Sequence, residues 1–180
     1  MKRALLLVDI QNDYFTGGAM QLVRMEAAAG KASSLLQCFR DRSEPVVHVR
    51  HLSKRPGATF FIPDTPGAEI HPAVEPLAGE PVVTKVFPNS FRGTNLQDLL
   101  KKADVGRLVI CGAMSHMCID ATARAAFDLG FACTVVEDAC ATRNLAFKGE
   151  TVPAWAVHGA FMAALQGIYA EVVSTGDLQI

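Results

Sequence analysis

The chain has 180 residues, half of them hydrophobic, and a formal net charge of -1 at pH 7. This length fits one domain, residues 1–180, with a sizeable buried core. The sequence contains no basic run of the kind that binds nucleic acid and no stretch approaching the roughly 20 apolar residues of a membrane span. We therefore expect neither a nucleic acid nor a membrane as partner.

The N-terminal segment MKRALLLVDIQNDYF has a basic start, but Asp9 interrupts its short apolar run. This pattern favours a strand over a signal peptide and indicates a cytoplasmic protein. The five cysteines are an odd number and show no CxxC spacing. They argue against a disulfide framework and against a cysteine zinc site.

Apolar segments alternate with helical patterns along the chain. We predict strands at residues 2–10, 45–51, 81–86, 106–113, 131–137 and 171–173. We predict helices at residues 23–42, 95–103, 119–130 and 152–168, with Thr94 as the N-cap of the second. The polar segment DACATRNLAFKGETV is expected to be a loop. Residues 52–80, rich in proline, are expected to be a functional loop or a lid. The alternation predicts an α/β fold of three αβα layers, with a mainly parallel sheet of roughly six strands.

Three polar residues fall at or just after the carboxyl ends of predicted strands: Asp9, Lys85 and Cys118. Ligands of such sheets bind at this edge. Cys118 would lie in the first turn of a helix with Ser115 as N-cap, where the helix dipole favours a thiolate. Alternatively, Cys118 is a buried core residue, and Asp9 and Lys85 form a structural ion pair.

The segments that carry these residues, DIQNDYFTGG, TKVFPNSFRGTNL and CGAMSHMCIDATARAAFDLG, resemble those of the isochorismatase-like cysteine hydrolases, a family that includes nicotinamidases and N-carbamoylsarcosine amidases. The resemblance implies a Rossmann-like fold and a catalytic triad of Asp9, Lys85 and Cys118. It also implies a cis peptide bond at Ala113–Met114 and an oxyanion hole made by the backbone N–H groups of Met114 and Cys118. It further implies a homodimer or homotetramer with pockets near the subunit contacts.

The residue types and the resemblance together imply a hydrolase with a small-molecule substrate, which cleaves a C–N bond of a small amide, carbamoyl or ureido compound. Cys118 would attack the carbonyl carbon while Asp9 moves protons and Lys85 holds positive charge beside them. The resulting thioester would then be hydrolysed. The alternatives are an isochorismatase-type vinyl ether hydrolase, which needs no thiol, and a ligand-binding or redox-sensing module without catalysis.

We expect no metal and no other cofactor. The Asp-x-His motif that nicotinamidases carry after the second strand is absent, which argues against that activity. His48 and His51 differ in strand parity, and His71 is distant in sequence, so these three are not expected to form a zinc site.

The remaining candidates surround the three central residues in sequence. The expected pocket residues are Tyr14, Phe15, Phe91, His116 and Met117, with Met114 as a further lining residue. Arg50, His51 and Arg55 could contact an anionic substrate, or could form a solvated face. His158, on an apolar helix, is expected to be a structural histidine.

Overall fold

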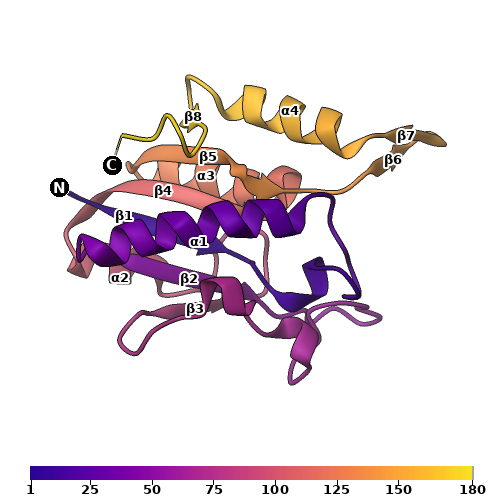
Figure 1. Ribbon diagram of the computed structural model, residues 1–180, viewed down its shortest axis with the longest axis horizontal. Helices are drawn as coiled ribbons and strands as arrows, with labels where there is room; N and C mark the ends of the chain where they lie inside the picture. The colour runs from indigo at the N-terminus through magenta and orange to yellow at the C-terminus, as the bar shows by residue number, and fades with distance from the viewer. Residues whose placement is uncertain (180) are drawn as a thin grey trace.

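The computed structural model describes residues 1–179 and contains a six-stranded sheet in the order β3-β2-β1-β4-β5-β8. All neighbouring strands are parallel. The strands are β1 (Lys2–Val8), β2 (Val46–His51), β3 (Val82–Lys85), β4 (Val105–Ala113), β5 (Ala132–Ala141) and β8 (Glu171–Val173). Figure 1 shows the sheet with its helices, and the predicted α/β architecture is confirmed.

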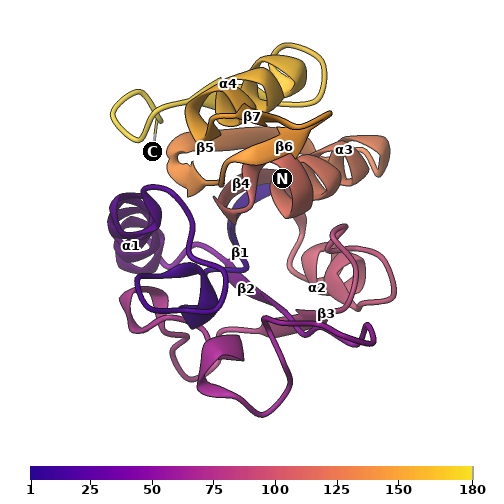
Figure 2. The same ribbon diagram turned by 90° about the vertical axis from the view of Figure 1, so that its right-hand side faces the viewer.

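Helices cover both faces of this sheet. The four helices are α1 (Met25–Asp41), α2 (Leu96–Lys102), α3 (Asp120–Asp128) and α4 (Ala154–Leu165). Figure 2 shows α1 on one side of the sheet and α2 and α3 on the other, with α4 beyond β5. Helix α4 also packs against β8. No helix among residues 1–179 has the length and apolar character that crossing a bilayer requires.

The centre of the sheet is formed by β1 and β4, which explains their continuous apolar sequences. Residues Ala4 to Val8 of β1 are at most 2% exposed, because helices pack on both faces of a parallel sheet. The strands pair directly, with Val8 opposite Gly112. Gly112 has φ +122°, and a Cβ at this position would overlap the carbonyl oxygen of Val8. Only glycine fits this close approach of two backbones just before the edge of the sheet.

Two expectations for local structure were wrong. β5 continues to Ala141, and the segment that follows forms an antiparallel hairpin of β6 (Leu145–Phe147) and β7 (Glu150–Val152). Lys148 and Gly149 both have positive φ, which is the geometry of a two-residue hairpin turn. The other correction concerns α2, whose N-cap is Asn95, although the Thr94 hydroxyl accepts a bond from the Leu96 N–H.

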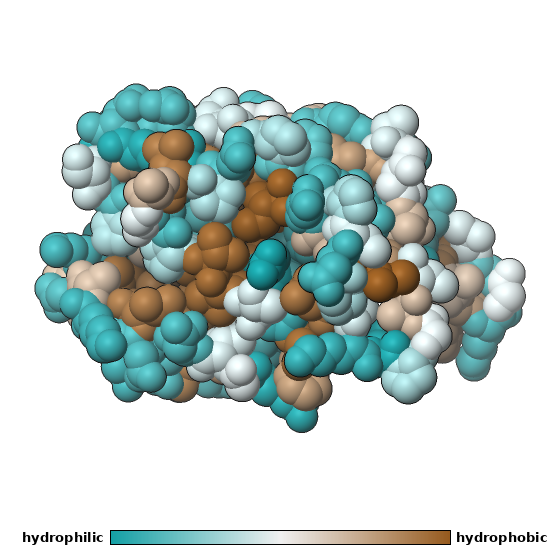
Figure 3. Space-filling model, turned by 90° about the horizontal axis from the view of Figure 1, so that it is seen from below, coloured by the Kyte–Doolittle hydropathy of each residue, from teal (hydrophilic) through white to brown (hydrophobic). Residues whose placement is uncertain are grey.

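The long segment between β2 and β3 contains two short 3₁₀ turns, η2 (Pro66–Ala68) and η3 (Pro72–Val74). Gln11 links this segment to the end of β2, because its side-chain amide donates to the carbonyl oxygens of His51 and Ala68 at 2.9 and 2.8 Å. Asp13 adds a second link by accepting the Phe61 N–H at 2.6 Å. Figure 3 views the molecule from below β3 and shows hydrophobic surface gathered in a hollow, with hydrophilic groups around it.

Candidate active site

Three segments bring Asp9, Lys85 and Cys118 together at the carboxyl edge of the sheet. Asp9 follows β1, Lys85 ends β3, and Cys118 lies in η4 (Ser115–Ile119), a π-helical turn between β4 and α3. The three residues are 0%, 1% and 5% exposed. The predicted ends of parallel strands therefore meet, and they form a nearly enclosed cluster of one acid, one amine and one thiol.

The ammonium group of Lys85 is the centre of this cluster. Its Nζ donates to Asp9 Oδ2 at 2.6 Å and to Cys118 Sγ at 3.2 Å, and lies 3.0 Å from His51 Nδ1. An ammonium has three N–H donors and no acceptor, so each of the three partners takes one hydrogen. His51 Nδ1 must therefore accept, which leaves the imidazole hydrogen on Nε2.

His51 belongs to the cluster, although the sequence suggested either a contact with an anionic substrate or a place on a solvated face. Burial and the Lys85 ammonium lower the pKa of His51 to about 4, so the ring is neutral at pH 7. A neutral imidazole attracts an anion far less strongly than a protonated imidazole does. The signal that identifies His51 is its position: it ends β2 and is paired with Lys85 in the β2–β3 register.

The electrostatics of Cys118 differ from the expectation of a stabilised thiolate. Burial raises the pKa of the Cys118 thiol, and the Asp9 carboxylate raises it further, while Lys85 lowers it only in part. Burial, the largest single effect, lowers the pKa of Lys85, but the charges of Asp9 and Cys118 and the hydrogen bonds to them together outweigh it, and the net shift is upward. The resting cluster is therefore a carboxylate–ammonium pair beside a neutral thiol.

The two carboxylate oxygens of Asp9 differ in their hydrogen bonds. Its Oδ1 is buried and has no hydrogen-bond partner among the described residues, whereas its Oδ2 accepts from Lys85. A carboxylate oxygen of Asp9 lies within 4.8 Å of the Cys118 sulfur. Burying a carboxylate oxygen without a hydrogen bond lowers the stability of the fold, so such an oxygen calls for a functional explanation. Accepting a proton during catalysis is one such function.

The backbone before Cys118 has an unusual form. The peptide bond between Ala113 and Met114 is cis. The N-cap of the π-helical turn is Met114, so the expectation that Ser115 caps this helix was wrong. Ser115 lies inside the turn, where its hydroxyl donates to the Ala141 carbonyl oxygen at 3.2 Å and contacts His158 Nδ1 at 2.8 Å.

The expected pocket residues lie in different surroundings. Tyr14 is 1% exposed and close enough to Asp9 and Cys118 for their charges to raise its pKa, after burial as the main cause. The Phe15 ring stacks on His71. The Phe91 ring stacks on Phe131, which directly precedes β5 and so lies at the amino edge of the sheet, opposite the edge that carries Cys118. The His116 ring contacts the Thr142 hydroxyl at 2.6 Å. Met117, beside Cys118, is 41% exposed.

The three histidines considered for zinc do not converge within residues 1–179. His48 Nε2 lies 2.9 Å from Glu80 Oε2, and His71 stacks on Phe15. The group of side chains with metal-ligand geometry is instead Asp9, His51 and Cys118. The Lys85 ammonium is bonded to all three of its members.

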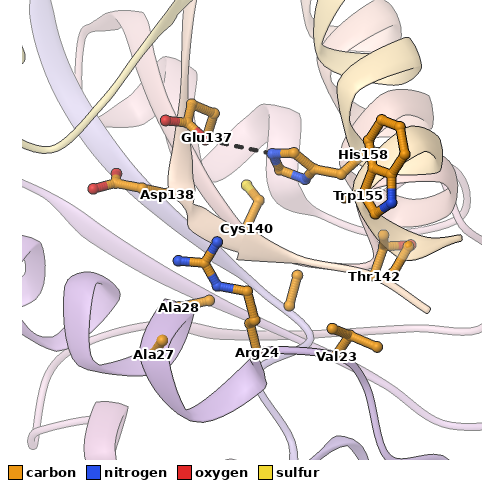
Figure 4. A pocket seen from close by; sticks show the side chains of 12 residues that line it. Val23, Arg24, Ala27, Ala28, Glu137, Asp138, Cys140, Thr142, Trp155 and His158 are labelled. Atoms are coloured by element: carbon orange, nitrogen blue, oxygen red, sulfur yellow. Dashed lines mark hydrogen bonds and ion pairs between the residues drawn. The ribbon is translucent and has the colours of Figure 1, made fainter. Parts of the chain in front are cut away.

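A cavity of about 260 Å³ lies between α1, β5 and α4, and contains none of Asp9, Lys85 or Cys118. Figure 4 shows that Arg24 reaches into it from the start of α1, opposite Trp155 and His158 of α4. His158 Nε2 lies 3.4 Å from Glu137 Oε2, and its other ring nitrogen contacts Ser115. This histidine thus joins α4 to the turn that holds Cys118, which fits the expected structural role.

The parallel sheet covered by helices, with buried polar residues at its carboxyl edge, is the architecture of an α/β hydrolase. The sequence profile of the isochorismatase domain matches residues 3–175. The chain belongs to the isochorismatase family. It is 53% identical, over 97% of both chains, to YddQ, an uncharacterised isochorismatase family protein of Bacillus subtilis.

Two further relatives are similar to this chain, one known by its crystal structure and one by its named activity. A crystal structure of a candidate isochorismatase hydrolase from Oleispira antarctica superimposes with a TM-score of 0.94 at 52% identity, covering 98% of this chain and 95% of the other. Maleamate amidohydrolase of Pseudomonas putida is 32% identical over 79% of this chain and 74% of its own length. This protein is thus an isochorismatase-family hydrolase, with relatives that act on C–N bonds.

Proposed function

We propose that the protein is a metal-independent cysteine hydrolase that cleaves a C–N bond of a small amide, carbamoyl or ureido substrate. The observation that carries the proposal is the pairing around Lys85, which bonds both Asp9 Oδ2 and Cys118 Sγ and leaves Asp9 Oδ1 without a partner. One carboxylate oxygen is held by the ammonium, and the other is available for the thiol proton.

The first step transfers the Cys118 proton to Asp9 as the sulfur attacks the carbonyl carbon. The neutral resting thiol makes this concerted transfer necessary, because an isolated thiolate is disfavoured in so buried a position. The Lys85 ammonium, 3.2 Å from the sulfur, stabilises negative charge as it develops. Asp9 then donates the proton to the departing nitrogen, which leaves as ammonia or an amine.

The second step removes the acyl group from sulfur. Asp9, again a carboxylate, accepts a proton from a water molecule that attacks the thioester carbonyl, and then returns a proton to Cys118. The backbone N–H groups of Met114 and Cys118 are the proposed oxyanion donors in both steps. Such donors each contribute roughly 3 kcal/mol to the transition state in other hydrolases.

The substrate is a small molecule, and we propose that the chain works as a homodimer or homotetramer in the cytoplasm. Support for self-association is the exposure of large apolar side chains on α4 and the neighbouring hairpin, where Trp155 is 79% and Phe147 69% exposed. Support for a reducing compartment is that all five cysteines are free thiols.

The proposal is tested by measuring ammonia release from a panel of amides, carbamoyl compounds and ureides that includes maleamate and nicotinamide. Cys118→Ala and Asp9→Asn should abolish release from any compound that the wild type hydrolyses, and mass spectrometry should find an acyl adduct on Cys118. Ammonia release retained in Cys118→Ala would contradict the proposal. A vinyl ether such as isochorismate is assayed beside the panel, and its cleavage by both wild type and Cys118→Ala, without ammonia release from the panel, would instead indicate the chemistry of isochorismatase, which needs no thiol. A panel without turnover or adduct would favour a binding or redox-sensing module.

A further inference from the structure

The donor atoms around Lys85 have a second chemical property besides their acid–base roles. A carboxylate oxygen of Asp9, an imidazole nitrogen of His51 and the sulfur of Cys118 all lie within 4.8 Å of one another. They come from the ends of β1 and β2 and from the turn after β4, so the sheet holds them in place. Oxygen, imidazole nitrogen and thiolate sulfur are together the ligand types that Zn²⁺ binds.

The position that such a metal would take is already filled. Lys85 Nζ lies 2.6, 3.0 and 3.2 Å from Asp9 Oδ2, His51 Nδ1 and Cys118 Sγ. Zinc binds the same atom types at about 2.0 to 2.3 Å, so each donor would move inward by only about 0.5 to 1 Å. Three protein ligands would leave a fourth position open for water.

We propose that Asp9, His51 and Cys118 form a latent site for a thiophilic divalent metal, Zn²⁺ or Cd²⁺, and that Lys85 keeps this site free of metal. The ammonium occupies the volume that the ion needs, and its positive charge repels the ion. Metal binding would release the thiol proton to solvent and form a metal–thiolate bond, with no change of oxidation state. Lys85 thus protects Cys118 from capture by zinc. This inference does not depend on which substrate the enzyme hydrolyses.

The test uses Lys85→Ala, which removes the charge of the side chain and empties the volume that the ion needs, with Cd²⁺ alone as probe. Wild type and variant are titrated with Cd²⁺ at neutral pH under reducing conditions. Bound metal is counted by elemental analysis, and the cadmium–thiolate charge-transfer band is followed in the ultraviolet. We expect one Cd²⁺ per chain in Lys85→Ala, bound at least about tenfold more tightly than by wild type. Zn²⁺ should compete for the same site.

Two controls locate the metal. Lys85→Ala combined with Cys118→Ser should lose the charge-transfer band and bind Cd²⁺ at least about tenfold more weakly than Lys85→Ala. Lys101→Ala removes an exposed ammonium from α2 and should behave as wild type. Equal Cd²⁺ affinity in wild type and Lys85→Ala would overturn the proposal, as would a band that survives the Cys118→Ser change.

Loss of Lys85 leaves the Asp9 carboxylate buried without a counter-charge, so the single variant could be unstable. Lys85→Ser is the second variant, since it also removes the charge and leaves room for both the ion and its water. If neither variant folds alone, each is refolded with and without Cd²⁺ and followed by circular dichroism. Recovery of the native spectrum with one Cd²⁺ per chain supports the proposal, and failure to recover overturns it.

Discussion

His51 Nδ1 lies 3.0 Å from Lys85 Nζ, and the two residues are paired directly across the ends of β2 and β3. The contact fixes two things together. It uses the third hydrogen of the ammonium, so Lys85 has no freedom to turn away from Asp9 and Cys118. It also places the hydrogen of the neutral imidazole on Nε2. The first consequence can be tested by substitution of His51.

His51→Asn places an amide oxygen close to the position of Nδ1 and can still accept from Lys85, whereas His51→Phe cannot. We expect His51→Phe to lower the rate of hydrolysis roughly tenfold, because one buried N–H of the ammonium loses its acceptor. The rate in His51→Asn should stay within about threefold of wild type, provided the hydrogen bond is preserved. The rates are compared on any substrate found in the panel, and equal losses in both variants would contradict the positioning role.

Asp9→Asn is expected to change reactivity and turnover in opposite directions. Hydrolysis should fall by at least about 100-fold, because the proton acceptor is lost. The pKa of the Cys118 thiol is raised by burial and then by Asp9, so removing the second effect leaves Lys85 to favour the thiolate. Alkylation of Cys118 by iodoacetamide, measured by mass spectrometry near neutral pH, should therefore be faster than in wild type. Slower alkylation would show that Asp9 activates the resting thiol.

Gly112→Ala should be strongly destabilising. The new methyl group would overlap the Val8 carbonyl oxygen, and φ +122° is unfavourable for alanine. We expect a loss of about 3 kcal/mol or more in the free energy of unfolding, measured by urea denaturation. Gly130→Ala is the matched control, since it has φ +88° with no atom near the added methyl, and should lose only about 1 kcal/mol. Similar losses would mean that the contact between β1 and β4 can relax.

The location of the site was predictable because it follows from a rule of architecture. Apolar runs mark the strands, parallel strands end at one edge, and Asp9, Lys85 and Cys118 stand at those ends. His51 stands at such an end too, but its partner Lys85 is 34 residues away, and strand order is needed to pair them. The hairpin of β6 and β7 had a local signal, the glycine of its two-residue turn, within a segment whose polarity suggested a loop.

The ionisation of the site could not be read from the sequence. A cysteine near the start of a helix suggests a stabilised thiolate, but burial and the Asp9 charge raise the pKa of Cys118. Burial depends on what the rest of the chain packs over the sulfur. Ser115 gives the same lesson: a good N-cap by residue type, it bonds instead to Ala141 and His158, which lie 26 and 43 residues further along the chain.

Acid should destabilise the fold in part through Glu80. Hydrogen bonding to Arg40 is the main reason that the pKa of Glu80 falls from 4.5 to about 2, and a bond to His48 adds to it. A carboxyl group whose pKa is lowered in the folded state stabilises the fold at pH values above its pKa in the unfolded state. This contribution is lost as the pH falls from about 4.5 towards 2.

Glu80→Gln should therefore be less stable than wild type at pH 7, and the difference in stability should shrink as the pH falls from about 4.5 towards 2. Urea unfolding at each pH measures it, with Glu69→Gln, an exposed carboxylate between η2 and η3, as control. A difference that stays constant from pH 7 to pH 2 would mean that the charge of Glu80 does not stabilise the fold.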